Sequence, residues 1–249
     1  RDISSGALHT NYVPRTAENL VVRNCQFKNN YAGNAAGALG VLGFNFLIDQ
    51  CTFDSNHVNY NTNCYGGAVQ VGVDTDESYG VLSNCRFMNN YAVSQNGISH
   101  GGAGCVRNGT SYINCIFLNN VADHGGALTY HASGSLENCE FYGNSANKYG
   151  GAVSISLEQT TMDLTVKDCT FNDNSAPLGG AMRLSGMNIG IENSYFNNNY
   201  ASEYGGAVSI DAQDVSISQS SFNNNVANID GGAVYINGQN TLIKDSEFL

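Results

Sequence analysis

The tetrapeptide Phe-x-x-Asn recurs eight times along these 249 residues, and this repeat restricts the fold more than any other feature of the sequence. Two residues before each Phe stands Cys or Ser, and two residues after each Asn stands Ala or Val. Gly-Gly-Ala, or a degenerate form of it, then follows. Successive Phe residues lie 24 to 34 positions apart, and a ninth, Phe248, comes one residue before the last. A fixed order of residue types at this period predicts a solenoid, in which each repeat packs mainly on its neighbours.

Alternating apolar residues predict strands at three places in each repeat. Examples are Val153 and Ile155 after Gly-Gly-Ala, Leu164 and Val166 further on, and Cys-x-Phe. A period of two means that one face of each strand is buried and the other is wet. A helical repeat is disfavoured, because the chain has 29 Gly and 35 Asn and only 12% charged residues. The sequence therefore predicts one all-β parallel β-helix over residues 1–249, with three strands per coil and about nine coils.

Stacked coils place residues of one type in columns about 4.8 Å apart. We expect the Phe residues to form an inward aromatic stack and the Asn side chains to form a ladder of amide hydrogen bonds. Gly-Gly suits a corner that needs a positive φ and leaves no room for a side chain. The two predicted ladders consist of Phe27, Phe53, Phe87, Phe117, Phe141, Phe171, Phe196 and Phe222, and of Asn30, Asn56, Asn90, Asn120, Asn144, Asn174, Asn199 and Asn225.

Six of the eight cysteines stand at the inward position two residues before Phe. Parallel side chains in adjacent coils would hold the Cβ atoms about 4.8 Å apart, whereas a disulfide prefers about 3.8 Å. We therefore interpret this column as buried thiols that fill volume, a role that Ser takes over at Ser194, Ser220 and Ser246. Cys64 and Cys105 lie outside the column.

Phe-x-x-Asn alternating with Gly-Gly-Ala-[Ile/Leu/Val] resembles the repeats of the polymorphic outer-membrane protein family, first defined in chlamydial autotransporter adhesins. The resemblance covers essentially the whole chain. It implies a right-handed β-helix that is exposed on a cell surface and acts in adhesion or as a structural fibre.

These observations predict a non-enzymatic extracellular β-solenoid, a cell-surface adhesin or a structural component of a surface fibre or sheath. Its expected partners are copies of itself, end to end or laterally, or a cell-surface ligand. The formal charge of −11 disfavours nucleic acid and anionic membrane surfaces. No apolar run reaches the roughly 18 residues of a membrane span. Because neither end shows a polar cap, we expect the segment to belong to a longer solenoid.

The alternative function is that of a parallel β-helix that binds or cleaves a polysaccharide. Cleavage needs paired carboxylates, or Ca²⁺ with an Arg or Lys base, on one outward face. Asp163, Asp168 and Asp173 are instead spread along a single coil, and Asp123-His124 precedes a Gly-Gly corner, where a turn role is favoured. We therefore expect no enzyme and assign no catalytic residue.

Three insertions, at 57–65, 72–80 and 91–100, lengthen individual coils. The first and third fall in adjacent coils and carry His57, Cys64 and His100, which could form a metal site but are better interpreted as solvated loop residues. The second carries Asp74, Asp76 and Glu77, whose carboxylates are the one Ca²⁺ candidate, although a solvent-facing turn is favoured. No other metal or cofactor is expected.

Overall fold

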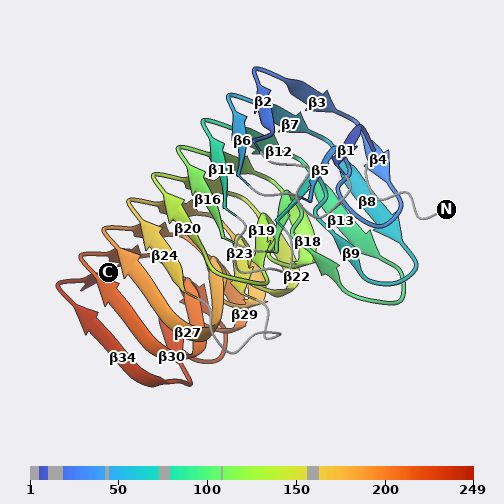
Figure 1. Cartoon of the computed structure of the whole chain (residues 1–249). Coiled ribbons are helices and arrows are strands. Elements are labelled where there is room, and N and C mark those ends of the chain that lie inside the picture. Colours follow the sequence, from blue (N-terminus) through green and yellow to red (C-terminus); the bar gives the residue numbers. More distant parts are fainter. Residues whose placement is uncertain (1–5, 11–18, 43–44, 73–78, 108, 156–162) are drawn as a thin grey trace.

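The computed structural model of the chain describes residues 6–10, 19–42, 45–72, 79–107, 109–155 and 163–249, and this part is a parallel β-helix (Figure 1). Each coil stacks on the one before it, from the N-terminal to the C-terminal end, and three parallel sheets run along the stack. The described residues contain no α-helix. The predicted fold class is confirmed.

Sheet B contains the Cys-x-Phe strands, one from each coil. Its strands, in order, are β3 (Gln26–Lys28), β7 (Thr52–Asp54), β12 (Arg86–Met88), β17 (Ile116–Leu118), β21 (Glu140–Tyr142), β25 (Thr170–Asn172), β28 (Tyr195–Asn197), β31 (Ser221–Asn223) and β35 (Glu247–Phe248). Phe aligns with Phe in every pair of adjacent strands, from Phe27 opposite Phe53 to Phe222 opposite Phe248. These nine strands enclose about eight complete turns, slightly fewer than the nine coils expected, because the first and last coils are partial.

The Phe residues form one continuous stack inside the solenoid. Neighbouring ring centroids are 4.6 to 4.9 Å apart, with interplanar angles of 2 to 6°. From Phe53 to Phe222 the side chains are completely buried. The ring spacing equals the spacing of hydrogen-bonded strands, so one Phe per coil fills the core without a gap.

Sheet C follows each Phe-x-x-Asn and was not among the three strand positions that the alternation predicted. Its strands are β4 (Tyr31–Ala32), β8 (His57–Tyr60), β13 (Tyr91–Ser94), β18 (Val121–His124), β22 (Ser145–Tyr149), β26 (Ser175–Leu178), β29 (Tyr200–Tyr204) and β32 (Val226–Ala227), joined by β9 (Cys64–Tyr65) and β14 (Ser99–His100). The four strands of two residues are too short to show alternation, and each longer strand buries only one side chain, as in β8 and β13, so the sequence pattern missed them. The insertions 57–65 and 91–100 lie side by side, because β8 pairs with β13 and β9 pairs with β14.

Sheet A combines the other two predicted strand positions. Its strands are β1 (Leu8–Thr10), β2 (Val21–Arg23), β5 (Leu39–Val41), β6 (Phe46–Asp49), β10 (Val69–Val71), β11 (Gly80–Ser83), β15 (Gly104–Val106), β16 (Thr110–Ile113), β19 (Leu128–Tyr130), β20 (Gly134–Glu137), β23 (Val153–Ile155), β24 (Leu164–Lys167), β27 (Met182–Glu192), β30 (Val208–Ser218), β33 (Val234–Ile236) and β34 (Gln239–Lys244). The short strands form two ladders that join at β27 and β30, where eleven residues run without interruption.

The Asn side chains form the predicted ladder. The backbone N–H and the Nδ2 group of one Asn both donate to Oδ1 of the Asn in the next coil, at 2.8 to 3.1 Å. From Asn56 to Asn225 each Nδ2 group also donates to the Phe carbonyl of the preceding coil. The amides therefore bridge three coils while buried, which satisfies groups that would otherwise be costly to remove from water.

Each coil turns at residues with positive φ, and most of them are not glycine. Asn, Asp, Gln or Ser has a φ of 46 to 57° at nearly every position three residues before and two residues after each Phe, as at Asn114 and Asn119. The left-handed region is accessible to Asn and Asp at lower cost than to most side chains. At Gly-Gly the first Gly has positive φ, whereas a Cβ on the second would lie about 2 Å from a carbonyl oxygen of the next coil, as at Gly102 and Gly126. The corner role predicted for Gly-Gly is confirmed.

The Cys column also has a hydrogen-bonding role. All eight cysteines are free, in line with the expected thiols. The Cys169 thiol donates to the carbonyl of Lys167 at 3.1 Å and accepts the N–H of Cys139 at 3.5 Å, and Ser194 Oγ accepts the N–H of Cys169 at 3.2 Å. A thiol and a hydroxyl both donate and accept, which explains why Ser replaces Cys in the last coils.

We predict that two adjacent asparagines differ in their energetic roles. Asn120→Ala should lower the free energy of unfolding by about 3 kcal/mol or more, because it leaves the buried backbone N–H of Asn90 without its acceptor. It also removes the bonds of the Asn120 side chain to Asn90 Nδ2, Asn144 Oδ1 and the Phe87 carbonyl. Asn119→Ala should cost only about 1–2 kcal/mol, because the exposed residue has positive φ, and Asn119→Gly should recover most of that loss. Denaturant unfolding of the three variants measures these differences. Equal losses for the two Ala variants would contradict the assignment.

Candidate functional site

Asp74, Asp76 and Glu77, with most of the 72–80 insertion, lie outside the residues that the structure describes. Within the described ranges, no group of three or more His, Cys, Asp or Glu side chains is arranged to hold a metal ion.

His57, Cys64 and His100 take up three different environments. His57 lies on the outer face of sheet C between Tyr31 and Tyr91, with ring centroids 5.0 and 4.5 Å away. Cys64 is fully buried in a small apolar cluster with Ala32, Val58, Ala92 and Ala122. His100 is buried at the Gly-Gly corner, so the interpretation as solvated loop residues is wrong for both Cys64 and His100.

The acidic residues weighed as catalytic candidates lie in a strand, at corners and beside a strand, and Asp123 belongs to β18. The Asp123 carboxylate accepts hydrogen bonds from the N–H of Ser99 and from Asn147 Nδ2, each at 3.0 Å. Burial raises the pKa of Asp123, but the hydrogen bonds from Asn147 and Ser99 outweigh burial and leave the pKa below its usual value. Asp168 and Asp173 occupy positive-φ corner positions, and Asp163 is exposed beside β24.

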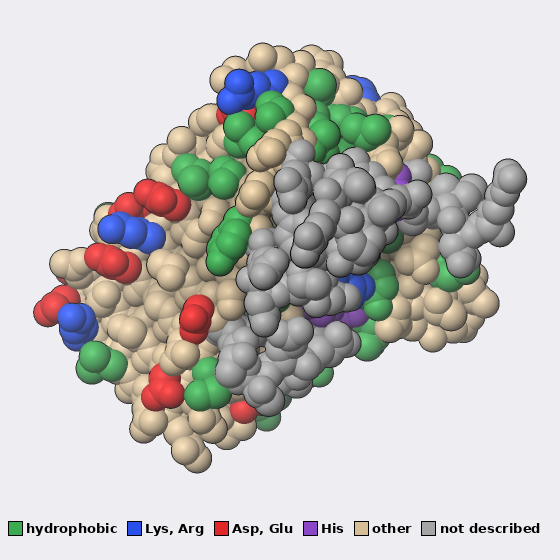
Figure 2. Space-filling view, viewed as in Figure 1, with side chains coloured by type: hydrophobic (Ala, Val, Ile, Leu, Met, Phe, Trp, Pro, Cys, Tyr) green, Lys and Arg blue, Asp and Glu red, His purple; other side chains and the backbone are tan. Residues whose placement is uncertain are grey.

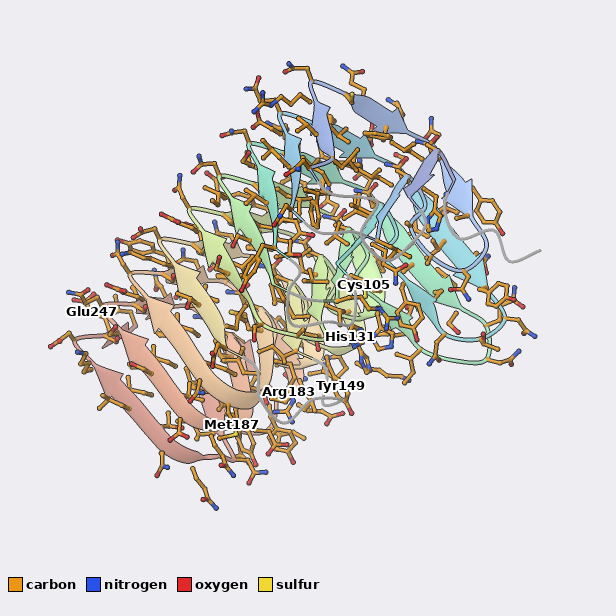
Figure 3. All side chains as sticks on the ribbon, viewed as in Figure 1. Cys105, His131, Tyr149, Arg183, Met187 and Glu247 are labelled. Carbon is orange, nitrogen blue, oxygen red and sulfur yellow. The ribbon has the colours of Figure 1, made fainter. Side chains whose placement is uncertain are left out.

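The structure instead gathers imidazole and phenol rings where the insertions meet sheet A. Tyr65 stacks on His100 with centroids 5.2 Å apart, and the His100 ring lies 5.1 Å from His124 and 4.9 Å from His131. Arg107 lies over the Tyr65 ring at 4.7 Å, a cation–π distance. Tyr149 contacts His124 at 4.6 Å. We call these six residues the corner cluster; Figure 3 labels His131 and Tyr149 within it, and Glu247 at the distant C-terminal coil.

The corner cluster keeps His100 and His124 neutral. Burial first, and then the electrostatic influence of His131, His124 and Arg107, lower the pKa of His100 to about 3. Burial, followed by the charge of Lys148, lowers the pKa of His124 to about 4. The negative charge of Asp123 raises the pKa of both histidines, but it does not cancel the lowering by burial. His100 and His124 are therefore neutral near pH 7, while Arg107 brings a positive charge to the cluster.

Sequence reasoning missed this cluster, although a signal was present. The residue before each Gly-Gly is aromatic in most coils, namely at Tyr65, His100, His124, Tyr149 and Tyr204. These positions align from coil to coil. Only the stacking of coils brings His131 and Arg107 onto this column, because they come from the ends of other strands.

A shallow notch of about 260 Å³ adjoins the corner cluster on sheet C. Lys148, Tyr149 and Glu203 line it together with Asn147, Pro177 and Leu178. Opposite charges at its rim leave the notch without a single-sign field for an ionic ligand. On the described part of the face in Figure 2, acidic and basic side chains are likewise interspersed.

Fold and repeat chemistry together place this chain among the parallel β-helix repeat proteins. Within that class, the Chlamydia polymorphic membrane protein repeat matches residues 138–156, 193–211 and 219–237. Each match begins one residue before the inward Cys or Ser, crosses sheets B and C, and ends after Gly-Gly-Ala in or just beyond sheet A. The resemblance drawn from the sequence is thus confirmed at three repeats, and it fits a surface-protein role.

Comparisons with curated proteins and with solved structures find no match. The described residues include no helix of the length and apolarity that crossing a bilayer requires.

We predict that acid destabilises the corner cluster. Because folding lowers the pKa of His100 and His124 below the value of about 6.5 in an unfolded chain, their contribution to stability is complete above pH 6.5 and is lost as the pH falls toward 4. His100→Phe should reduce the loss of unfolding free energy between pH 6.5 and 4.5 by about 2–3 kcal/mol. Denaturant titrations at both pH values measure the free energy of unfolding. An equal loss of this free energy in wild type and variant would refute the prediction.

We also predict that the native thiols are unreactive. Burial raises the pKa of Cys51, Cys115 and Cys139, and it raises that of Cys64 to about 12. A thiol reagent at pH 8 should label at most the half-buried Cys25 rapidly, and the remaining cysteines only after unfolding. Cys25→Ser is the control and should abolish the fast phase. Rapid labelling of several thiols in the native protein would contradict the buried column.

Proposed function

We propose that this chain is part of a non-enzymatic protein displayed on a cell surface, where its rigid β-solenoid acts as an adhesin or as a structural component of a surface fibre or sheath. One observation carries the proposal: the repeated polar residues stabilise the fold itself. The buried Asn side chains are committed to bonds between coils, and Asn or Asp at the corners provides positive φ.

Two further observations support an extracellular setting. The match to the polymorphic membrane protein repeat falls on three coils. The formal charge of −11 keeps a long rod soluble and disfavours binding to nucleic acid. Lengthened coils at 57–65 and 91–100 are the places where such a rod differs from a uniform stack, and they suit recognition of a partner.

The surface role can be tested by immunolabelling. Antibodies against residues 6–249 should label intact cells of the source organism, and brief protease treatment of those cells should remove the label. Labelling that requires permeabilised cells would overturn the proposal. Labelled material in isolated fibres or sheaths favours the structural role, whereas single displayed chains that bind other cells favour the adhesin.

The polysaccharide alternative has its own readout. Acidic and neutral polysaccharides incubated with the purified chain should show no new reducing ends or unsaturated products. Cleavage that is lost on replacing one carboxylate would replace the proposed role with an enzymatic one.

A further inference from the structure

The outer face of sheet B carries an apolar strip in its middle coils. Two outward columns flank the inward Phe stack, formed by the residue before and the residue after each Phe. The column after Phe contains Met88, Leu118 and Tyr142, and Ile116 lies beside them in the column before Phe. All four side chains are only partly buried. Elsewhere in sheet B these columns are largely polar or charged, so the strip is local to β12, β17 and β21.

Two opposite charges bracket this strip. Arg86 and Glu140 are both exposed, and they lie one coil before and one coil after Ile116 in the same column. We call Arg86, Met88, Ile116, Leu118, Glu140 and Tyr142 the outer patch. Along the solenoid the column before Phe therefore runs positive, apolar, negative.

This order is self-complementary. Consider two copies whose sheets B face each other, related by a two-fold axis that runs parallel to β17 midway between the sheets. The two-fold rotation reverses the order of coils, and each column then faces the same column of the other copy. Arg86 then faces the partner's Glu140, and Met88 faces the partner's Tyr142. Ile116 and Leu118 each face their own copies. A two-fold interface requires this kind of match, in which one surface fits itself.

We propose that the outer patch binds a second copy of this chain, face to face and with the two solenoids antiparallel. The interface contains two Arg–Glu pairs, two contacts between a Met thioether and a Tyr ring, and a central cluster of Ile and Leu. This inference does not depend on the surface role proposed above.

The flanking coils fit the same register. Thr52 faces the partner's Thr170, and Asp54 faces the partner's Asn172. One coil further out, Gln26 faces the partner's Tyr195, and Lys28 faces the partner's Asn197. No two like charges oppose each other across these seven strands. A register shifted by one coil loses the pairing of Arg86 with Glu140, and one shifted by two coils brings Arg86 or Glu140 opposite its own copy. Like charges directly opposite would cost affinity, so the charges favour the register centred on β17.

The contact is small. Seven strands at about 4.8 Å and a strand width of about 10 Å cover roughly 340 Å² of sheet, below the roughly 800 Å² per partner of a standard interface. The formal charge of −11 on each copy adds repulsion at low salt. We therefore expect a weak dimer, with a Kd of about 10 µM or above, that strengthens at moderate ionic strength.

A charge-exchange experiment tests the register. Sedimentation velocity of the full chain, from about 5 to 500 µM, should show reversible dimerisation, and Arg86→Glu and Glu140→Arg should each weaken it at least tenfold because like charges then meet. The double variant R86E/E140R should recover wild-type affinity, since the exchanged charges again face each other. Lys167→Glu and Glu137→Arg make the same charge changes on sheet A and should leave dimerisation within a factor of about three.

Three outcomes would overturn the proposal. If the wild-type chain stays monomeric over the whole concentration range, the outer patch does not bind a second copy of the chain. A double variant no better than the single variants rejects the two-fold register. If neither single variant changes the dimerisation affinity, the copies associate through another surface, such as the ends of the stack. Far-ultraviolet circular dichroism confirms that each variant is folded, which is expected because Arg86 and Glu140 are both exposed.

Discussion

Backbone hydrogen bonding between coils fixes the spacing of this molecule, and every other feature adapts to it. Parallel strands bond at about 4.8 Å, so each side chain meets its counterpart one coil above and one below at that distance. A residue persists in a column only if it tolerates copies of itself. Phe does so through stacked rings, and Ala, Val and Ile do so through simple contact. A charged residue does not, which accounts for a charged fraction of 12%.

The carboxamide meets this constraint in a buried position. It carries a donor and an acceptor on one group, so a column of Asn can bond indefinitely in both directions, as Asn90, Asn120 and Asn144 do. A column of Asp would offer only acceptors and like charges. Asn also tolerates positive φ at the corners, so one residue type performs two unrelated tasks. The 35 Asn residues follow from that double use rather than from disorder.

Repetition decided how much of the fold could be predicted. The Phe stack, the Asn ladder and the Gly-Gly corner were predictable because each recurs and each has one physical explanation. The corner Asn residues were not, since Asn119 and Asn120 look alike in sequence and differ only in φ and burial. Sheet C was missed because its longer strands each bury a single side chain, as at Ala92 in β13 and Ala122 in β18, which leaves no alternation to read. The corner cluster was missed because His131 and Arg107 occur once and reach Tyr65 and His100 only through the stacking of coils.

In such a solenoid, specific recognition of a partner has to come from the residues that interrupt the repeating columns. Inward positions are held by packing and hydrogen bonding, so a change there affects stability first. Outward positions tolerate change, and in sheet B they vary from Arg86 through Ile116 to Glu140 while the Phe beneath them stays constant. The same coils carry lengthened turns in sheet C and the His-rich corner next to sheet A. The irregular residues of the middle coils therefore distinguish this rod from a uniform stack, and partner recognition is to be sought there rather than in the ladders.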